Sequence, residues 1–163
     1  MARHQSLILP EINDLIQLIE EWKKQGQTIV FTNGCFDIIH SGHISYLEEA
    51  SKEGNKLVVA INSDESVKRI KGVSRPINRE MDRARVLSAI GVVDAVTIFS
   101  EDTPYALIQE VRPNVLVKGG DWKIEEIVGS DIVLNDGGQV KSLGFLSGYS
   151  TTKIASKIKQ SEP

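Results

Sequence analysis

The sequence predicts an α/β fold, a Rossmann-like doubly wound sheet of five mainly parallel strands with helices on both faces. Two observations support this fold class. Short β-branched runs that are apolar on both sides are typical of strands buried within a parallel sheet, and they occupy residues 28–31, 57–61, 95–99 and 115–117. Helical segments fill the gaps, at about 43–54, 79–90 and 102–112. Such alternation of strand and helix predicts right-handed crossovers.

The two ends of the chain extend this core. Residues 1–25 form the leading segment, in which apolar side chains recur at helical spacing over 11–25, so an amphipathic helix is expected there. Residues 132–134 and 140–146 are expected to be late edge strands, with an antiparallel direction as an open alternative. A last helix is expected over 151–159, followed by a frayed tail at 160–163.

Length and composition bound the class of protein. A chain of 163 residues with no linker or repeat predicts one domain over 1–163. The net charge of −3 gives no basic field for nucleic acid. One cysteine forms no internal disulfide, and no apolar run is long enough for a signal peptide or a membrane span. We therefore expect a cytoplasmic protein without nucleic-acid or membrane partners, and a homodimer or higher homo-oligomer by default.

Polar side chains gather where the predicted strands end. They occupy residues 33–43, 62–64, 118–121 and 147–152. Open parallel sheets bind ligands outside the carboxyl ends of their strands, at the point where the strand order reverses. The four clusters are therefore expected to meet at one small-molecule site.

The first cluster holds the strongest motif, His40-Ser41-Gly42-His43. Both imidazoles lie at the predicted start of a helix, where free N–H groups and the helix dipole favour an anion. Gly34 and Gly42 let the backbone approach phosphates closely. We interpret the motif as an oligophosphate site. The alternatives are a helix cap beside a core histidine, or a zinc site, for which no neighbouring third His and no second Cys complete the ligand set.

Three further segments complete the predicted site. Ser150, Thr151 and Thr152 open the last helix, as anion ligands or as an ordinary cap. Lys118 and Asp121 flank two glycines that could equally belong to a plain loop. A basic run over 68–83 contains Arg75 and Arg83 and suggests a second anion, against a merely solvated loop. Cys35 has no adjacent base, so we favour packing or backbone contact over nucleophilic catalysis.

These motifs resemble those of the nucleotidylyltransferase superfamily, through His40-Ser41-Gly42-His43 and Ser150-Thr151-Thr152-Lys153-Ile154. More narrowly, the chain resembles the heptose-1-phosphate adenylyltransferase family of lipopolysaccharide assembly over about residues 26–158. The segments that carry this likeness cover residues 32–37, 62–64, 71–78, 118–121 and 148–152. In many bacteria this activity forms the C-terminal half of a protein that also has a sugar kinase, and we expect the stand-alone form here.

The resemblance implies ATP as a substrate, with Mg²⁺ on its triphosphate and no dedicated metal site on the protein. AMP would pass to D-glycero-D-manno-heptose 1-phosphate, giving ADP-heptose and pyrophosphate for lipopolysaccharide core synthesis. It further implies roles for individual residues: His40, His43 and Lys118 in catalysis, Cys35, Phe36, Asp37, Gly42, Asp121, Ser150, Thr151 and Thr152 around the nucleotide, and Arg75, Arg83 and Lys118 at the sugar phosphate.

Two positions depart from related cytidylyltransferases, which have a Lys and an Arg where this chain has Ser45 and Phe145. This counts against glycerol phosphate or choline phosphate as the acceptor, and Lys118 and Arg83 are candidates for the missing charge. Tyr149 replaces a smaller residue of many relatives. The alternatives are a cytidylyltransferase for a polyol or sugar phosphate, a dinucleotide-forming adenylyltransferase, and a catalytically silent nucleotide-binding module.

Overall fold

The computed structural model describes residues 6–144 and 151–160. One sheet runs through it in the order β1-β4-β3-β2-β5-β6, and every neighbouring pair of strands is parallel. The strands are β1 Leu7–Ile8, β2 Ile29–Gly34, β3 Lys56–Asn62, β4 Ala95–Phe99, β5 Val115–Gly119 and β6 Gln139–Leu143. The predicted α/β class is confirmed, but the sheet has six strands and not five.

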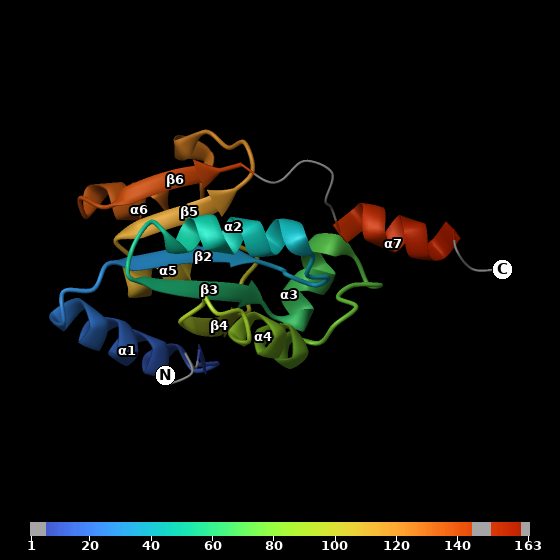
Figure 1. Ribbon diagram of the computed structural model, residues 1–163, viewed down its shortest axis with the longest axis horizontal. Coiled ribbons are helices and arrows are strands. Elements are labelled where there is room, and N and C mark those ends of the chain that lie inside the picture. Colours follow the sequence, from blue (N-terminus) through green and yellow to red (C-terminus); the bar gives the residue numbers. More distant parts are fainter. Residues whose placement is uncertain (1–5, 145–150, 161–163) are drawn as a thin grey trace.

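Helices cover both faces of this sheet (Figure 1). They are α1 Ile12–Lys24, α2 Ser41–Ser51, α3 Asp64–Lys71, α4 Glu80–Ser88, α5 Tyr105–Val111, the 3₁₀ turn η1 Ile124–Glu126, α6 Ser130–Asn135 and α7 Thr151–Gln160. None of the helices in the described part of the chain is long and apolar enough to cross a bilayer. Residues 161–163 of the predicted tail lie outside the described residues, and residue 160 is still helical.

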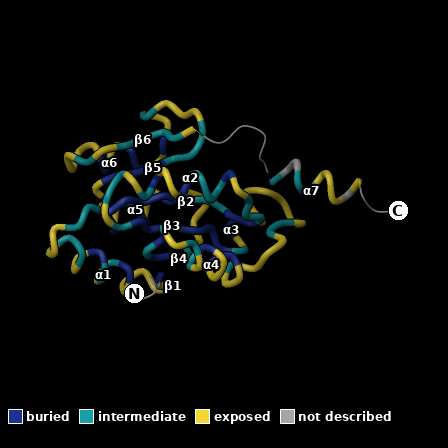
Figure 2. Tube along the Cα trace, viewed as in Figure 1, coloured by how far each residue is buried: buried dark blue, intermediate teal, exposed yellow. Residues whose placement is uncertain are grey.

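The core consists of two apolar layers, one on each face of the sheet. Alternate strand residues point to opposite faces, so Phe31 joins the layer under α1 and α5 while its neighbour Val30 joins the layer under α2 and α4. The strands in the middle of the sheet are buried along most of their length (Figure 2). A parallel sheet covered in this way holds its strand ends rigidly, which fixes the loops that follow them.

The end of the chain departs from the predicted order. Residues 132–134 belong to α6 and not to a strand. A three-residue apolar run has the same pattern in a helix and a strand, and Gly129, at φ +85°, begins a helix here. Because α6 then serves as the crossover between β5 and β6, β6 is parallel and not antiparallel. The predicted residues 145 and 146 lie outside the described residues.

Two further elements were not predicted. Strand β1 has only two residues and pairs with β4, too short a run for any periodicity. Helix α3 begins at Asp64 and its last residues, 68–71, are the first residues of the predicted basic run. Its start has a clear local cause, because the Ser63 side chain accepts a hydrogen bond from the backbone N–H of Ser66 at 3.2 Å.

The strand order reverses beside β2. The chain proceeds from β2 to β3 and β4 on one side of the sheet, then returns to place β5 and β6 on the other side. The carboxyl ends of β2 and β5 therefore form the switch point at which such sheets bind ligands. Helix α7 lies beyond these strand ends (Figure 1).

Candidate active site

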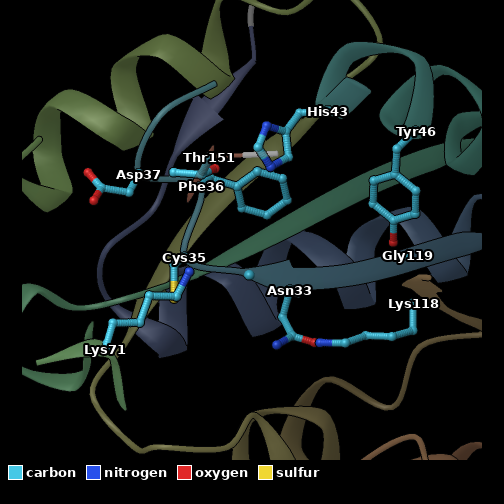
Figure 3. A pocket seen from close by; sticks show the side chains of 11 residues that line it. Asn33, Cys35, Phe36, Asp37, His43, Tyr46, Lys71, Lys118, Gly119 and Thr151 are labelled. Atoms are coloured by element: carbon cyan, nitrogen blue, oxygen red, sulfur yellow. The ribbon is translucent and has the colours of Figure 1, made fainter. Parts of the chain in front are cut away.

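A cavity of about 180 Å³ opens at this switch point (Figure 3). Side chains reach it from β2, α2, α3, β5 and α7, elements that are far apart in the sequence. Its lining consists of Asn33, Gly34, Cys35, Phe36, Asp37, His43, Tyr46, Lys71, Lys118, Gly119 and Thr151. The structure thus brings together the segments after β2 and β5 and the start of the last helix, as the sequence predicted.

The two histidines lie at the start of α2. His40 is the N-cap residue, and its ring stacks on the ring of His43 with 4.0 Å between the centroids. The backbone N–H of His40 donates to Nδ1 of His43 at 3.4 Å. A neutral imidazole whose Nδ1 accepts carries its hydrogen on Nε2. His43 is therefore arranged as a hydrogen-bond donor through Nε2.

The charge state of His43 supports the same assignment. Burial, followed by the nearby His40 and Lys71, lowers the pKa of His43 from 6.5 to about 4. The ring is therefore neutral at neutral pH in the absence of an anion. An oligophosphate placed beside it would favour the protonated form, because a nearby negative charge stabilises a cation.

Phe36 forms a sharp turn between β2 and the histidines. Its backbone has φ +47°, in the left-handed region that bulky residues rarely adopt. The ring packs against His43 with 5.3 Å between centroids. A Cβ atom on Gly34 would come within 2.9 Å of this ring, so the glycine makes room for the ring of Phe36.

Asp37 lines the cavity, but its carboxylate is bound by other parts of the protein. Its side chain is only 1% exposed, and its carboxylate accepts from Arg75 Nε at 2.6 Å and from the backbone N–H groups of Ile77 and Asn78. Burial alone raises its pKa, but the hydrogen bonds from Asn78, Ile77 and Arg75 outweigh burial and the net pKa is lowered. The carboxylate therefore holds the 75–78 loop, while Asp37 as a residue still lines the cavity expected to take the nucleotide.

Two of the three predicted sugar-phosphate ligands, Arg75 and Arg83, do not line the cavity, whereas Lys118 does. Arg75 pairs with Asp37. The side chain of Arg83 is 1% exposed, and it donates to Asp64 Oδ1 at 2.8 Å and to the backbone oxygens of Cys35 and Asn78. The expectation that Arg83 meets the sugar phosphate is thus wrong for this structure, because its guanidinium is buried among protein acceptors.

Of the two charged residues predicted at the end of β5, Lys118 lines the cavity and Asp121 does not. Lys118 reaches the cavity, and burial lowers its pKa. Within the described residues, neither Lys118 nor Lys71 forms an ion pair, so two cations face the cavity without a protein counter-ion. Asp121 is exposed and does not line the cavity.

The last helix reaches the site through Thr151, which lines the cavity and whose hydroxyl donates to the Ile38 carbonyl at 3.5 Å. Ser150 lies outside the described residues, and so does the side chain of Thr152. Gly42 is buried in the first turn of α2, and the Cys35 thiol lies 3.8 Å from Asn62 Oδ1.

Three lining residues had no individual role predicted from the sequence: Asn33 within the polar cluster at 33–43, Lys71 within the basic run at 68–83, and Tyr46. Tyr46 follows His43 by three positions on α2, and this spacing places both on one helix face, a signal that was available. Its hydroxyl lies 2.6 Å from Thr32 Oγ1, and burial raises its pKa to about 12 despite that hydrogen bond. The position of Lys71 at the cavity could not be predicted, because it depends on α3, a helix that was not expected.

Fold and site together define a class of protein. A doubly wound sheet whose switch-point cavity gathers an imidazole, two ammonium groups and a helix start is built to bind the phosphates of a nucleotide. The comparison with protein families agrees: residues 31–157 match the cytidylyltransferase-like family model. The chain belongs to the cytidylyltransferase-like family.

Two curated relatives show which members of this family the chain resembles. The chain is 55% identical over 150 residues to the bifunctional protein HldE of Actinobacillus pleuropneumoniae serotype 5b, with 92% of this chain and 32% of the relative covered. It is 51% identical over 149 residues to the bifunctional protein HldE of Pseudomonas aeruginosa, with 91% and 32% covered. The chain therefore spans about a third of the length of these relatives.

Two solved structures share the fold. The lipopolysaccharide core biosynthesis protein of Thermoplasma volcanium superposes with a TM-score of 0.61 at 34% identity, covering 77% of this chain and all of that one. The pantoate-beta-alanine ligase of Francisella tularensis gives a TM-score of 0.62 at 20% identity, covering 95% and 78%. The second likeness is one of fold alone.

Proposed function

We propose that this protein transfers AMP from ATP to D-glycero-D-manno-heptose 1-phosphate, releasing pyrophosphate and forming ADP-heptose for lipopolysaccharide core synthesis. One observation carries the proposal: His43, Lys71 and Lys118 converge on one switch-point cavity, with His40 stacked behind His43. The choice of substrate is supported by the sequence likeness to HldE proteins and to a lipopolysaccharide core biosynthesis protein.

The proposed reaction needs position and positive charge. An oxygen of the sugar phosphate attacks the α-phosphorus of ATP in line, the bond to the bridging oxygen of pyrophosphate breaks, and that oxygen keeps the electron pair. Negative charge grows on the leaving group. The Nε2–H of His43, together with His40 and Lys118, would stabilise this charge, and no covalent enzyme intermediate is required.

Substrate positions follow from the elements around the cavity. The nucleotide would lie against Cys35, Phe36, Asp37 and Thr151, which line the cavity, and the family resemblance adds Gly42, Asp121, Ser150 and Thr152. Lys71 faces the cavity from α3, so we assign to it the acceptor phosphate that the sequence had assigned to Arg83.

Mg²⁺ is proposed to accompany ATP. Among the described residues, no three His, Cys, Asp or Glu side chains come together as a metal site, and the Asp37 carboxylate is held by the 75–78 loop. The family resemblance implies that the triphosphate itself holds the ion, whose charge would neutralise the departing pyrophosphate.

The test is a screen for pyrophosphate release with ATP and CTP against a panel of acceptors. The panel contains both anomers of the heptose 1-phosphate, other sugar 1-phosphates and glycerol 3-phosphate. We expect the highest kcat/KM with ATP and a heptose 1-phosphate. Turnover only with CTP and glycerol phosphate would contradict the assignment. ATP binding without pyrophosphate release from any acceptor would favour a nucleotide-binding module.

A further inference from the structure

The turn at Phe36 separates two cavities. One is the 180 Å³ cavity lined by His43, Lys71 and Lys118; His40 does not line it but stacks on His43. The other has about 250 Å³, and it is lined by Phe36, Asp37, Ile38, Ile39, Asn78, Asp82, Arg83 and Val86. Phe36 and Asp37 line both cavities, whereas Arg83 and Asn78 line only the second. Arg83 and Asn78 therefore contact the Phe36 turn from the side opposite the candidate active site.

The turn is held on both of its sides by hydrogen bonds to the backbone. Arg83 Nη1 donates to the carbonyl oxygen of Cys35, the residue before Phe36, at 2.6 Å. Asn78 Nδ2 donates to the carbonyl oxygen of Asp37, the residue after it, at 2.6 Å. A left-handed φ at a bulky residue persists only where the surroundings hold it. We refer to Arg83 and Asn78 as the Phe36 clamp.

The clamp is itself anchored. Arg83 is fully buried, and it also bonds Asp64 Oδ1 at the start of α3 and the carbonyl oxygen of Asn78. The backbone N–H of Asn78 in turn donates to the Asp37 carboxylate at 2.8 Å. One connected set of hydrogen bonds thus joins α3, α4 and the 75–78 loop to the turn. Networks that include charges are stiff, because buried polar groups tolerate little misalignment.

The turn leads directly to the histidines. The Phe36 ring lies against the His43 ring (Figure 3), and Nδ1 of His43 accepts from the backbone of His40. A change in the Phe36 backbone would move its ring, and the His43 imidazole would lose the surface against which it packs. Misplacement of a catalytic group by about 1 Å can cost about 10²-fold in rate.

We propose that Arg83 and Asn78 are positioning residues that hold Phe36 in its left-handed turn, and that the Phe36 ring in turn orients the His43 imidazole for phosphoryl transfer. Neither clamp residue lines the substrate cavity, so neither is expected to determine how tightly ATP binds. The kinetic part of this proposal rests on the proposed function, and the structural part does not.

The kinetic test uses Arg83→Lys and Asn78→Ala. A lysine cannot reach the three acceptors of Arg83 at once, and Asn78 is exposed, so its truncation leaves no core cavity. We expect each variant to lower kcat about 10-fold or more while the KM for ATP changes by less than about 3-fold, the pattern of a lost transition-state interaction. The matched control is Arg85→Lys on the exposed face of α4, which should keep full activity.

A double-mutant cycle separates this role from general stabilisation. In a Phe36→Leu background the ring that reaches His43 is gone, so Arg83→Lys should lower kcat by less than about 2-fold further. Coupled residues give such non-additive losses, and independent ones do not. Equal losses with and without the Phe36 ring, or a loss confined to KM, would overturn the proposal.

A readout without substrate separates failure of this proposal from failure of the proposed function. The chain has three histidines, whose ring carbon-bound protons can be assigned by NMR with His40→Gln and His43→Gln variants. We expect the His43 resonances to shift in Arg83→Lys and Asn78→Ala, because the ring current of Phe36 moves, and to stay in place in Arg85→Lys. Unchanged His43 resonances in both clamp variants would refute the clamp whatever reaction the protein catalyses.

Discussion

The two ends of the sheet hold the same backbone conformation for opposite purposes. At the carboxyl end Phe36 has φ +47°, and at the amino end Arg112 has φ +44°. A cavity lies at each end, of about 180 Å³ beside Phe36 and about 430 Å³ beside Arg112. Lysine or arginine side chains line both cavities. The smaller one is nevertheless the candidate active site.

The two cavities differ in whether their lysine and arginine side chains are bound to other protein groups. At the amino end, Lys23 Nζ donates to the carbonyls of Val111 and Arg112, which end α5, and Arg112 pairs with Asp136 at 2.7 Å in an exposed position. At the carboxyl end, Lys71 and Lys118 form no ion pair among the described residues. Neither charge nor cavity size alone therefore identifies a site for an anion. What identifies it is a pair of lysines that face a small cavity and form no ion pair among the described residues.

The histidine pair gives the largest expected contrast between the two ends. We expect His40→Ala or His43→Ala to lower kcat for pyrophosphate release by about 10²- to 10³-fold, since each removes a preorganised donor at a developing charge. Arg112→Ala at the amino end should leave kcat unchanged. Steady-state kinetics with ATP and the heptose phosphate provide the measurement. An equal loss at both ends would erase the distinction.

The second largest effect is expected from replacing lysines that line the two cavities. Lys118→Met or Lys71→Met should lower kcat/KM by about 10- to 10²-fold, because hydrogen bonds to charged groups are worth about 1.5–3 kcal/mol. The corresponding change at the other end, Lys23→Met, should leave kcat/KM within about 2-fold of wild type. Full activity in both cavity variants would show that the two ammonium groups do not serve the phosphates.

Alanine substitutions at two glycines are expected to affect activity in one case and stability in the other. In Gly34→Ala the new Cβ meets the Phe36 ring at 2.9 Å, and because this ring can shift we expect about a 10-fold loss of kcat with little change in stability. In Gly138→Ala it meets the Asn114 carbonyl oxygen at 2.6 Å, which cannot move freely, so stability should fall by about 1–3 kcal/mol with kcat intact. Urea denaturation and kinetics on both variants test the contrast, which the reverse assignment of the losses would contradict.

The smallest effect concerns pH. His43 has a pKa of about 4 in the folded protein against an ordinary value of 6.5. Between these values the unfolded chain binds a proton that the folded protein does not, so the free energy of unfolding decreases as pH falls from 6.5 to 4. Relative to His43→Gln, wild type should lose about 2–4 °C more in Tm over this window, since solvent screens the half-buried ring. Parallel Tm curves from scanning calorimetry would disprove the assignment.

Local patterns were enough for much of the fold. The runs at 57–61 and 95–99 became β3 and β4, because strands buried on both faces must be apolar throughout. The amphipathic spacing over 11–25 became α1. Shorter elements escaped, since β1 has two residues and α6 arises from an apolar run that fits helix and strand equally.

The site was predictable where its residues are neighbours in sequence. His40 and His43 lie three positions apart at a helix start, and their convergence follows from helix geometry. Arg83 was misassigned for the opposite reason. A charged residue in a basic run looks the same whether it faces a ligand or a buried carbonyl, and only the packing of α4 against the 35–37 turn shows that Arg83 faces the latter.

The sequence by itself determined the class of fold, the end of the sheet that holds the candidate active site and the histidine pair, because periodicity and close spacing are properties of short stretches of chain. Only the tertiary structure decided which cations face the cavity and which are buried in the scaffold, and it added Lys71 while removing Arg83. The physical reason is that a charged side chain takes its role from its partners, and two of the three partners of Arg83 are separated from it by 19 and 48 positions along the chain.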